Sequence, residues 1–99
     1  MSKKHAQRSH FQRRVFERYD ITVNDGEYDF IVSKIRKNDK NIVHFLMKQS
    51  NRITVNLIEF KNKHIVVVYD KIRKTLCTCL PEECIDISKI NNYIQEVEE

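Results

Sequence analysis

The chain of 99 residues contains a single glycine and a single proline. Flexible linkers and long loops are rich in these two residues, so their scarcity leaves little chain for such segments. Because Gly26 is the one glycine, a glycine-rich phosphate-binding loop is excluded. We find no internal repeat and no low-complexity segment, and the length suits one domain with one modest core.

Long apolar runs are lacking too, since none approaches the roughly 20 residues of a membrane span. The basic N-terminus has no apolar stretch of the signal-peptide kind, so we expect neither secretion nor a membrane partner. The three cysteines, Cys77, Cys79 and Cys84, are an odd number and form no disulfide framework, which favours reduced thiols and a cytoplasmic location. Their spacing completes no zinc site, and we expect no metal and no cofactor.

Charge is distributed unevenly along the chain, whose formal net charge is +4. Residues 1–18 contain six Lys or Arg and one Glu, whereas residues 82–99 contain six Asp or Glu and one Lys. A basic front favours a polyanion as partner, and the acidic end either shields the basic surface or aids solubility. Charge alone leaves RNA, DNA and an anionic membrane surface open as that polyanion.

A first amphipathic helix is predicted near the N-terminus. Ser9 followed by Gln12 has the spacing of a capping box, which predicts a helix from about 10 to 19, although a start near His5 is an alternative. Residues 1–8 would then be a flexible basic extension. The predicted buried stripe of the helix consists of Val15, Phe16 and Tyr19.

A second helix is predicted after Asn24, because Glu27 repeats the capping-box spacing. Its apolar residues recur at helical intervals, and the helix ends near the polar residues 37–41. These apolar residues are Tyr28, Ile31, Val32 and Ile35.

From residue 42 onward, β-branched runs alternate with short polar breaks, as expected of an antiparallel sheet. The predicted strands cover residues 42–48, 52–60, 63–70 and 74–80. Residues 65–69 are continuously apolar and favour a central strand covered on both faces. After Pro81 we predict a helix from about 88 to 97 with Ser88 as its N-cap. The sequence thus predicts an α+β domain over residues 9–81, with two helices packed on four antiparallel strands, and an acidic C-terminal helix or tail over 82–99.

The first helix also carries the main candidate for a functional site. His10, Arg14 and Arg18 are four residues apart each time and therefore share one helical face. A row of like charges lowers the stability of the helix by a few tenths of a kcal/mol per pair, and bound phosphates would offset that loss. Arginine suits phosphate because its planar fork makes two parallel hydrogen bonds. The alternative is a solvated basic face relieved in part by Glu17, four residues from Arg13.

His10 is the residue of that face whose proton is exchangeable near neutral pH. Cleaving RNA without a metal requires a base for the ribose 2′-OH, donors for the charge on phosphorus and an acid for the leaving oxygen. A surface histidine without a chemical role is an equally good interpretation. His44 and His64 fall in predicted strands and are expected to be structural or surface residues, and His5 is less well placed.

The predicted sheet supplies further candidates. Arg52, Lys61 and Lys63 flank the second hairpin and would extend the basic surface. The hydroxyl groups of Tyr69 and Thr78 would donate hydrogen bonds to a phosphate if they faced the helix, although both are more often ordinary strand residues.

Two stretches together resemble a known superfamily. The first runs from His10 through Arg14 and Glu-Arg18-Tyr to Ile21, and the second is Val-Val-Tyr69-Asp followed by Thr78-Cys-Leu-Pro81. They resemble small phage and bacterial proteins of the barnase–EndoU–colicin–RelE superfamily of metal-independent ribonucleases, which includes many toxins. The resemblance spans residues 10–81, and the acidic segment after Pro81 departs from the pattern.

This resemblance implies helices packed on a four-stranded antiparallel sheet, with a cleft where the first helix meets the sheet. It implies that His10 is the acid/base and that Arg14 and Arg18 bind phosphate, with Arg52, Tyr69 and Thr78 contributing from the sheet. Arg13, Lys61 and Lys63 would add RNA contacts. Proteins of this kind act in the cytoplasm, which is the host cytoplasm for a phage-encoded member.

Three functions remain open from the sequence. The leading hypothesis is a toxin-like endoribonuclease that uses 2′-OH attack to leave a 2′,3′-cyclic phosphate, with an antitoxin or another protein as a partner. The second is a non-enzymatic RNA-binding protein of phage origin that uses the same basic face. The third is a protein-interaction or host-takeover factor that binds an acidic surface.

Overall fold

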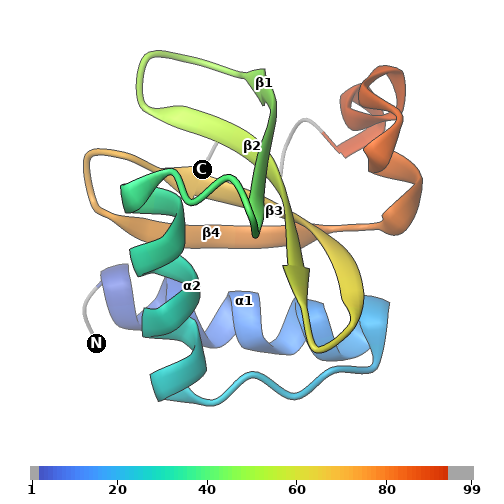
Figure 1. Cartoon of the computed structure of the whole chain (residues 1–99). Helices are drawn as coiled ribbons and strands as arrows, with labels where there is room; N and C mark the ends of the chain where they lie inside the picture. Colours follow the sequence, from blue (N-terminus) through green and yellow to red (C-terminus); the bar gives the residue numbers. More distant parts are fainter. Residues whose placement is uncertain (1–2, 94–99) are drawn as a thin grey trace.

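Two helices come first in the chain, and four strands follow them (Figure 1). The computed structural model describes residues 3–93. The elements are α1 (Lys3–Tyr19), α2 (Asp25–Lys37), β1 (Val43–Lys48), β2 (Ile53–Phe60), β3 (Lys63–Asp70) and β4 (Thr75–Leu80), then the 3-10 helices η1 (Glu82–Ile85) and η2 (Ile87–Tyr93). All neighbouring strands pair antiparallel in the order β1-β2-β3-β4. The predicted α+β fold is confirmed.

Helix α2 forms as its sequence predicts. The Asn24 side chain accepts a hydrogen bond from the backbone N–H of Glu27 at 2.8 Å, and the Glu27 carboxylate accepts one from the backbone N–H of Asn24 at 2.9 Å. This reciprocal pair satisfies N–H groups that have no partner within the helix. At the other end, Asn38 adopts the left-handed conformation (φ 53°) and its N–H donates to the carbonyl of Ile35. The predicted capping box is confirmed.

Helix α1 differs from its prediction in both its start and its buried face. It begins at Lys3, so Ser9 lies inside the helix and the predicted capping box at Ser9 is wrong. Phe16 is 56% exposed, and Phe11 is fully buried in its place. Successive residues of a helix point about 100° apart. Because Val15 points at the sheet, the next residue, Phe16, points away from it. The residues of α1 that are buried are Gln7, Phe11, Val15 and Tyr19, each four apart.

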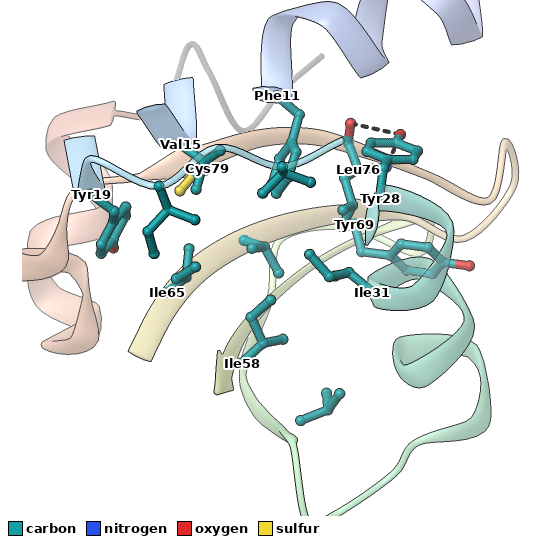
Figure 2. Close-up of a cluster of buried hydrophobic side chains, with 14 residues drawn as sticks. Phe11, Val15, Tyr19, Tyr28, Ile31, Ile58, Ile65, Tyr69, Leu76 and Cys79 are labelled. Carbon is teal, nitrogen blue, oxygen red and sulfur yellow. Dashed lines mark hydrogen bonds between the residues drawn. The ribbon is translucent and has the colours of Figure 1, made fainter. Parts of the chain in front are cut away.

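Strand β3 is the central strand that its apolar run predicted. Its alternate residues face opposite layers, and those from 65 to 70 are all buried. Ile65, Val67 and Tyr69 pack beneath the two helices (Figure 2). Val66 and Val68 lie in a second apolar cluster with residues of η1 and η2.

Helix α1 runs beside β4 (Figure 1), and its side chains bond to that strand along its length. The Thr75 hydroxyl donates to the side-chain oxygen of Gln7 at 2.7 Å, and the Tyr19 hydroxyl donates to the Leu80 carbonyl at 2.8 Å. Burial raises the pKa of Tyr19, which therefore stays protonated as a donor. Helix α1 thus lies against β4, and these hydrogen bonds fix the position of the helix relative to the sheet.

The two helices also contact each other and share β4 as a support. The rings of Phe11 and Tyr28 meet edge to face with 5.7 Å between centroids. The Tyr28 hydroxyl accepts a hydrogen bond from the backbone N–H of Leu76 at 2.8 Å (Figure 2). Burial raises the pKa of Tyr28 to about 12. The face of α1 opposite this contact is left on the outside of the molecule.

The C-terminal helix differs from its prediction. The segment Ile87–Tyr93 is a 3-10 helix, and Ser88 lies inside it, so the prediction of an N-cap at Ser88 is wrong. Asp86 takes the capping position, because its carboxylate accepts hydrogen bonds from the backbone N–H and the hydroxyl of Ser88 at 3.1 and 2.7 Å. The predicted helix beyond residue 93 lies outside the described residues.

Candidate functional site

His10 projects from α1 toward β4, and its ring is held on two sides. Its Nε2 lies 3.1 Å from the Thr78 hydroxyl oxygen, and its Nδ1 lies 3.4 Å from the Arg13 guanidinium. Thr78 is 1% exposed, whereas His10 is half-buried. A solvent-borne ligand would therefore meet the imidazole and Arg13 before it met the Thr78 hydroxyl. The arrangement makes Thr78 a group that orients the ring.

The arginines of α1 continue the same face toward its C-terminal end. The Arg14 guanidinium pairs with Glu17 at 3.0 Å, one turn further along. Arg18 donates to the carbonyl oxygen of Cys79 at 2.7 Å, and its guanidinium lies over the ring of Tyr93 at 5.4 Å. We call His10, Arg13, Arg14 and Arg18 together the α1 basic face.

A cavity of about 570 Å³ opens at the end of the α1 basic face. Its wall combines cationic side chains with carboxylates, so it offers both hydrogen-bond donors and acceptors. Arg18 belongs to both the cavity and the basic face. The residues that line it are Glu17, Arg18, Tyr19, Asp20, Asn62, Lys63, His64, Glu82 and Ile85.

Two lysines predicted to extend the basic surface lie at the same end of α1. The Lys63 ammonium donates to the backbone carbonyl of Tyr19 at 2.8 Å, which places a cation at the negative end of the helix dipole. Lys61 pairs with Glu27 at 3.0 Å and donates to the carbonyl of Thr22 at 2.8 Å. Lys63 therefore adjoins the cavity, while Lys61 ties the chain before α2 to the sheet.

Two other predicted site residues lie apart from the α1 basic face. Tyr69 is 4% exposed within the core cluster under α2, where burial raises its pKa and the charge of Arg36 opposes that rise. Arg52 binds Asp70 through two hydrogen bonds of 3.3 and 2.8 Å. Among residues 3–93, no hydrogen bond joins Tyr69 or Arg52 to His10, Arg14 or Arg18.

The remaining histidines and the cysteines offer no competing centre. His44 and His64 are exposed strand residues, and His64 lies 3.6 Å from Glu59. Cys77, Cys79 and Cys84 are buried and form no disulfide. Within the part of the chain that the structure describes, no three His, Cys, Asp or Glu side chains come together as a metal site would require. No helix in residues 3–93 has the length and apolarity to cross a membrane.

Sequence reasoning missed two features near this site. Tyr93 supplies the ring beneath Arg18, and nothing in the local sequence of η2 indicates that contact. The turn between β3 and β4 carries Lys71, Arg73 and Lys74. The sequence predicted a hairpin break over residues 71–73 and placed Lys74 in the following strand. Three cations in four residues were the signal that could have identified it.

Comparison of the chain with protein-family models, with curated proteins and with solved structures gave no match. The resemblance to the barnase–EndoU–colicin–RelE superfamily accordingly stays a prediction, carried by the motifs quoted above. Any function must be argued from the geometry of the chain itself.

Proposed function

We propose that this chain binds RNA along the α1 basic face. The observation that carries the proposal is the set of four basic side chains along α1, namely His10, Arg13, Arg14 and Arg18. His10 and Arg18 border β4, Arg13 is exposed, and the cavity lies at the end of the set. At 1.5 Å per residue, His10 and Arg18 are about 12 Å apart along the helix axis. A line of cations of that length suits several successive phosphates rather than a single one.

The placement of charge in α1 supports a ligand rather than helix stability. Its first turn contains no acidic residue and begins with Lys3 and Lys4, where the helix dipole favours acids. Arg13 and Arg14 add two adjacent cations, and Glu17 is the one acidic residue within the helix. A bound polyanion would offset this arrangement of like charges.

Single-stranded RNA fits the geometry better than a duplex does. The cations follow one helix, spread over about 140° of its circumference from Arg13 to Arg18. An unstacked base is the kind of group that would enter the cavity at the end of the helix. The Arg18 guanidinium lines the cavity and its Cζ lies 5.4 Å from the centroid of the Tyr93 ring, so the guanidinium is available to stack on a base that enters the cavity. The resemblance stated above points to RNA rather than DNA.

The test is binding of a labelled single-stranded RNA of about twelve nucleotides, measured by fluorescence anisotropy at several salt concentrations. We expect Arg13→Gln and Arg14→Gln each to weaken binding about three- to tenfold and to reduce the salt slope by about 0.7. Lys48→Gln, on β1 at the other edge of the sheet, serves as the matched control and should leave affinity unchanged. Absence of RNA binding at low salt, or equal loss in the control, would overturn the proposal.

A second candidate function is metal-independent cleavage of the bound RNA. The contact between His10 and the Thr78 hydroxyl favours it, because a fixed imidazole beside arginines is what a general base requires. His10 would take the proton of a ribose 2′-OH as its oxygen attacks phosphorus. The bond to the 5′-oxygen breaks, that oxygen takes a proton from the imidazolium of His10 or from water, and a 2′,3′-cyclic phosphate remains. Thr78 would position His10, and Tyr69 has no part in this proposal.

Cleavage is tested by incubating RNA with the protein in EDTA and resolving the fragments. Discrete fragments that end in cyclic phosphate are expected, and His10→Ala should abolish them while RNA binding falls less than tenfold. Fragments that persist with His10→Ala would show that His10 is not the base. Tight binding without fragments would leave RNA binding as the function.

A further inference from the structure

The turn between β3 and β4, residues 71–74, presents an apolar side chain surrounded by cations. Ile72 is 70% exposed, more than any other large hydrophobic side chain among the described residues. Lys71 and Lys74 are exposed on either side of it, and Arg73 is partly covered. An isoleucine this exposed gains little from burial within the fold, and its side chain is open to contact with a ligand that the neighbouring cations attract.

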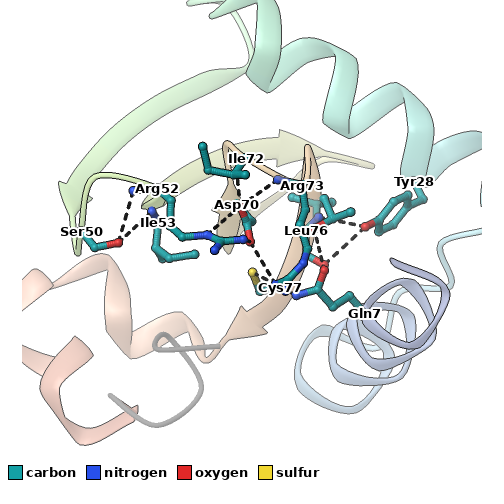
Figure 3. A network of polar contacts seen from close by, with 11 residues as sticks. Gln7, Tyr28, Ser50, Arg52, Ile53, Asp70, Ile72, Arg73, Leu76 and Cys77 are labelled. Carbon is teal, nitrogen blue, oxygen red and sulfur yellow. Dashed lines mark hydrogen bonds and ion pairs between the residues drawn. The ribbon is translucent and has the colours of Figure 1, made fainter. Parts of the chain in front are cut away.

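The turn is held rigidly by the buried carboxylate of Asp70 (Figure 3). One carboxylate oxygen accepts from the backbone N–H groups of Ile72 and Arg73 at 2.9 and 3.0 Å. Both oxygens bind the Arg52 guanidinium, and the Lys74 N–H donates to the Asp70 carbonyl at 2.7 Å. A tip fixed in this way loses little conformational entropy when it binds a ligand.

The ion pairs in the structure leave this tip strongly basic. Within residues 3–93, Arg73 makes the one ion pair of the turn, at 3.5 Å to Asp70, and none includes Lys71 or Lys74. Asp70 is at the same time neutralised by Arg52 at 2.8 Å. The outward-facing charge of residues 71–74 is therefore positive, and its complement is an anionic surface.

The turn also lies near the N-terminal end of α1, before the α1 basic face begins at His10. Thr75, the residue after the turn, bonds to Gln7 of α1 at 2.7 Å, and Thr78 in the same strand contacts His10. Residues 71–74 thus lie at the end of the α1–β4 seam opposite the cavity. A polymer laid along the α1 basic face would reach the turn if it continued past His10 toward the start of α1.

We infer that the β3–β4 turn is a second contact for the same RNA, a step that depends on the proposed function. Lys71 and Lys74 bind phosphates, and Ile72 packs against an unpaired base between them. The ligand class is then narrower than RNA in general. It is an RNA with an unpaired segment long enough to span from the cavity to the turn, and a shorter strand occupies only part of the site.

The experiment compares a labelled twelve-nucleotide single-stranded RNA with a four-nucleotide one, using three variants. Ile72→Ser should weaken binding of the longer RNA about fivefold without changing its salt slope, since it removes apolar contact and no charge. Lys71→Gln with Lys74→Gln should reduce that slope by about 1.4. Binding of the shorter RNA, placed on the α1 basic face, should change less than twofold. Lys48→Gln is again the control.

The outcomes separate the two proposals. If Arg14→Gln weakens binding of the longer RNA and the turn variants do not, the turn is not a contact and the function of α1 stands. If no RNA binds at low salt, the proposed function fails as well. Binding to phosphatidylserine vesicles that Ile72→Ser abolishes, with RNA affinity unchanged, would overturn the inference and assign the turn to a lipid surface. A thermal melt of each variant confirms that it is folded.

Discussion

The imidazole Nε2 of His10 lies 3.1 Å from the hydroxyl oxygen of Thr78, although 68 residues separate them in the chain. This contact joins α1 to β4 along the edge where the two elements meet. It leaves Nδ1 next to Arg13, at 3.4 Å, on the more open side of the ring. The position of His10 therefore depends on how α1 docks against the sheet, and not on α1 alone.

Replacing Thr78 by Val keeps the shape of this buried side chain and removes the hydroxyl. We expect the free energy of unfolding to fall by about 1 kcal/mol, the usual net value of such a hydrogen bond. The ¹⁵N chemical shifts of the His10 ring should also change, because its tautomer loses a partner. Urea denaturation and NMR would measure the two effects. Thr22→Val, at an exposed loop position, is the control, and an equal shift in both variants would contradict the assignment.

Two phenylalanines of α1 provide a test of how the helix packs. Phe11 is fully buried, so Phe11→Ala should lower the free energy of unfolding by about 3–5 kcal/mol. Phe16 is 56% exposed, and Phe16→Ala should change it by less than about 1 kcal/mol. Urea denaturation of both variants under the same conditions gives the comparison. The reverse order would mean that α1 is rotated by about 140° from the orientation described, because five residues separate Phe11 from Phe16.

The success of the α2 prediction and the failure at Phe16 have the same physical origin. The caps of α2 are contacts between Asn24 and Glu27, three residues apart, so the local sequence determines them. In α1 both candidate stripes have helical spacing, and the choice between Phe11 and Phe16 depends on the sheet. Gln7 finds its partner in Thr75, which no local pattern reveals.

The candidate site shows the same division between local and distant contacts. The spacing of His10, Arg14 and Arg18 is local, so the sequence predicted a common helical face. Thr78 became a candidate through its place in a predicted strand and through the resemblance, and its contact with His10 depends on tertiary packing. The roles assigned to Tyr69 and Arg52 stay predictions, and the structure places one in the core and the other against Asp70.

The ion pair between the buried Asp70 and Arg52 makes the free energy of unfolding depend on pH. Burial raises the pKa of Asp70, but hydrogen bonds from Arg52 and from two backbone N–H groups outweigh it, so the pKa lies below its ordinary value. A carboxyl whose pKa is lowered by folding contributes stability above its unfolded pKa of about 3.9, and loses it as the pH falls through the folded value. We therefore expect the free energy of unfolding to decline as the pH falls below about 4.

Asp70→Asn isolates this contribution from that of other carboxyls. It should lower the free energy of unfolding at pH 7 by about 2 kcal/mol, since it weakens charge-assisted hydrogen bonds to the partly exposed Arg52, and should make the decline below pH 4 shallower. Urea denaturation at pH 7, 4 and 3 measures both quantities. An acid dependence as steep as that of the unmodified chain would mean that Asp70 titrates with an ordinary pKa.

Glu17 offers a gain-of-function test of the α1 basic face. Its carboxylate lies 3.0 Å from the Arg14 guanidinium and lines the cavity, so it opposes any phosphate bound there. Glu17→Gln should tighten binding of the twelve-nucleotide RNA by about three- to fivefold at low salt, because one repelling charge is removed. The gain should shrink as salt is raised, and the free energy of unfolding should change by less than about 0.5 kcal/mol. Asp39→Asn removes one negative charge after α2, at a residue outside the cavity lining, as a control. An equal gain in both variants would mean that RNA responds to net charge, and not to the α1 basic face.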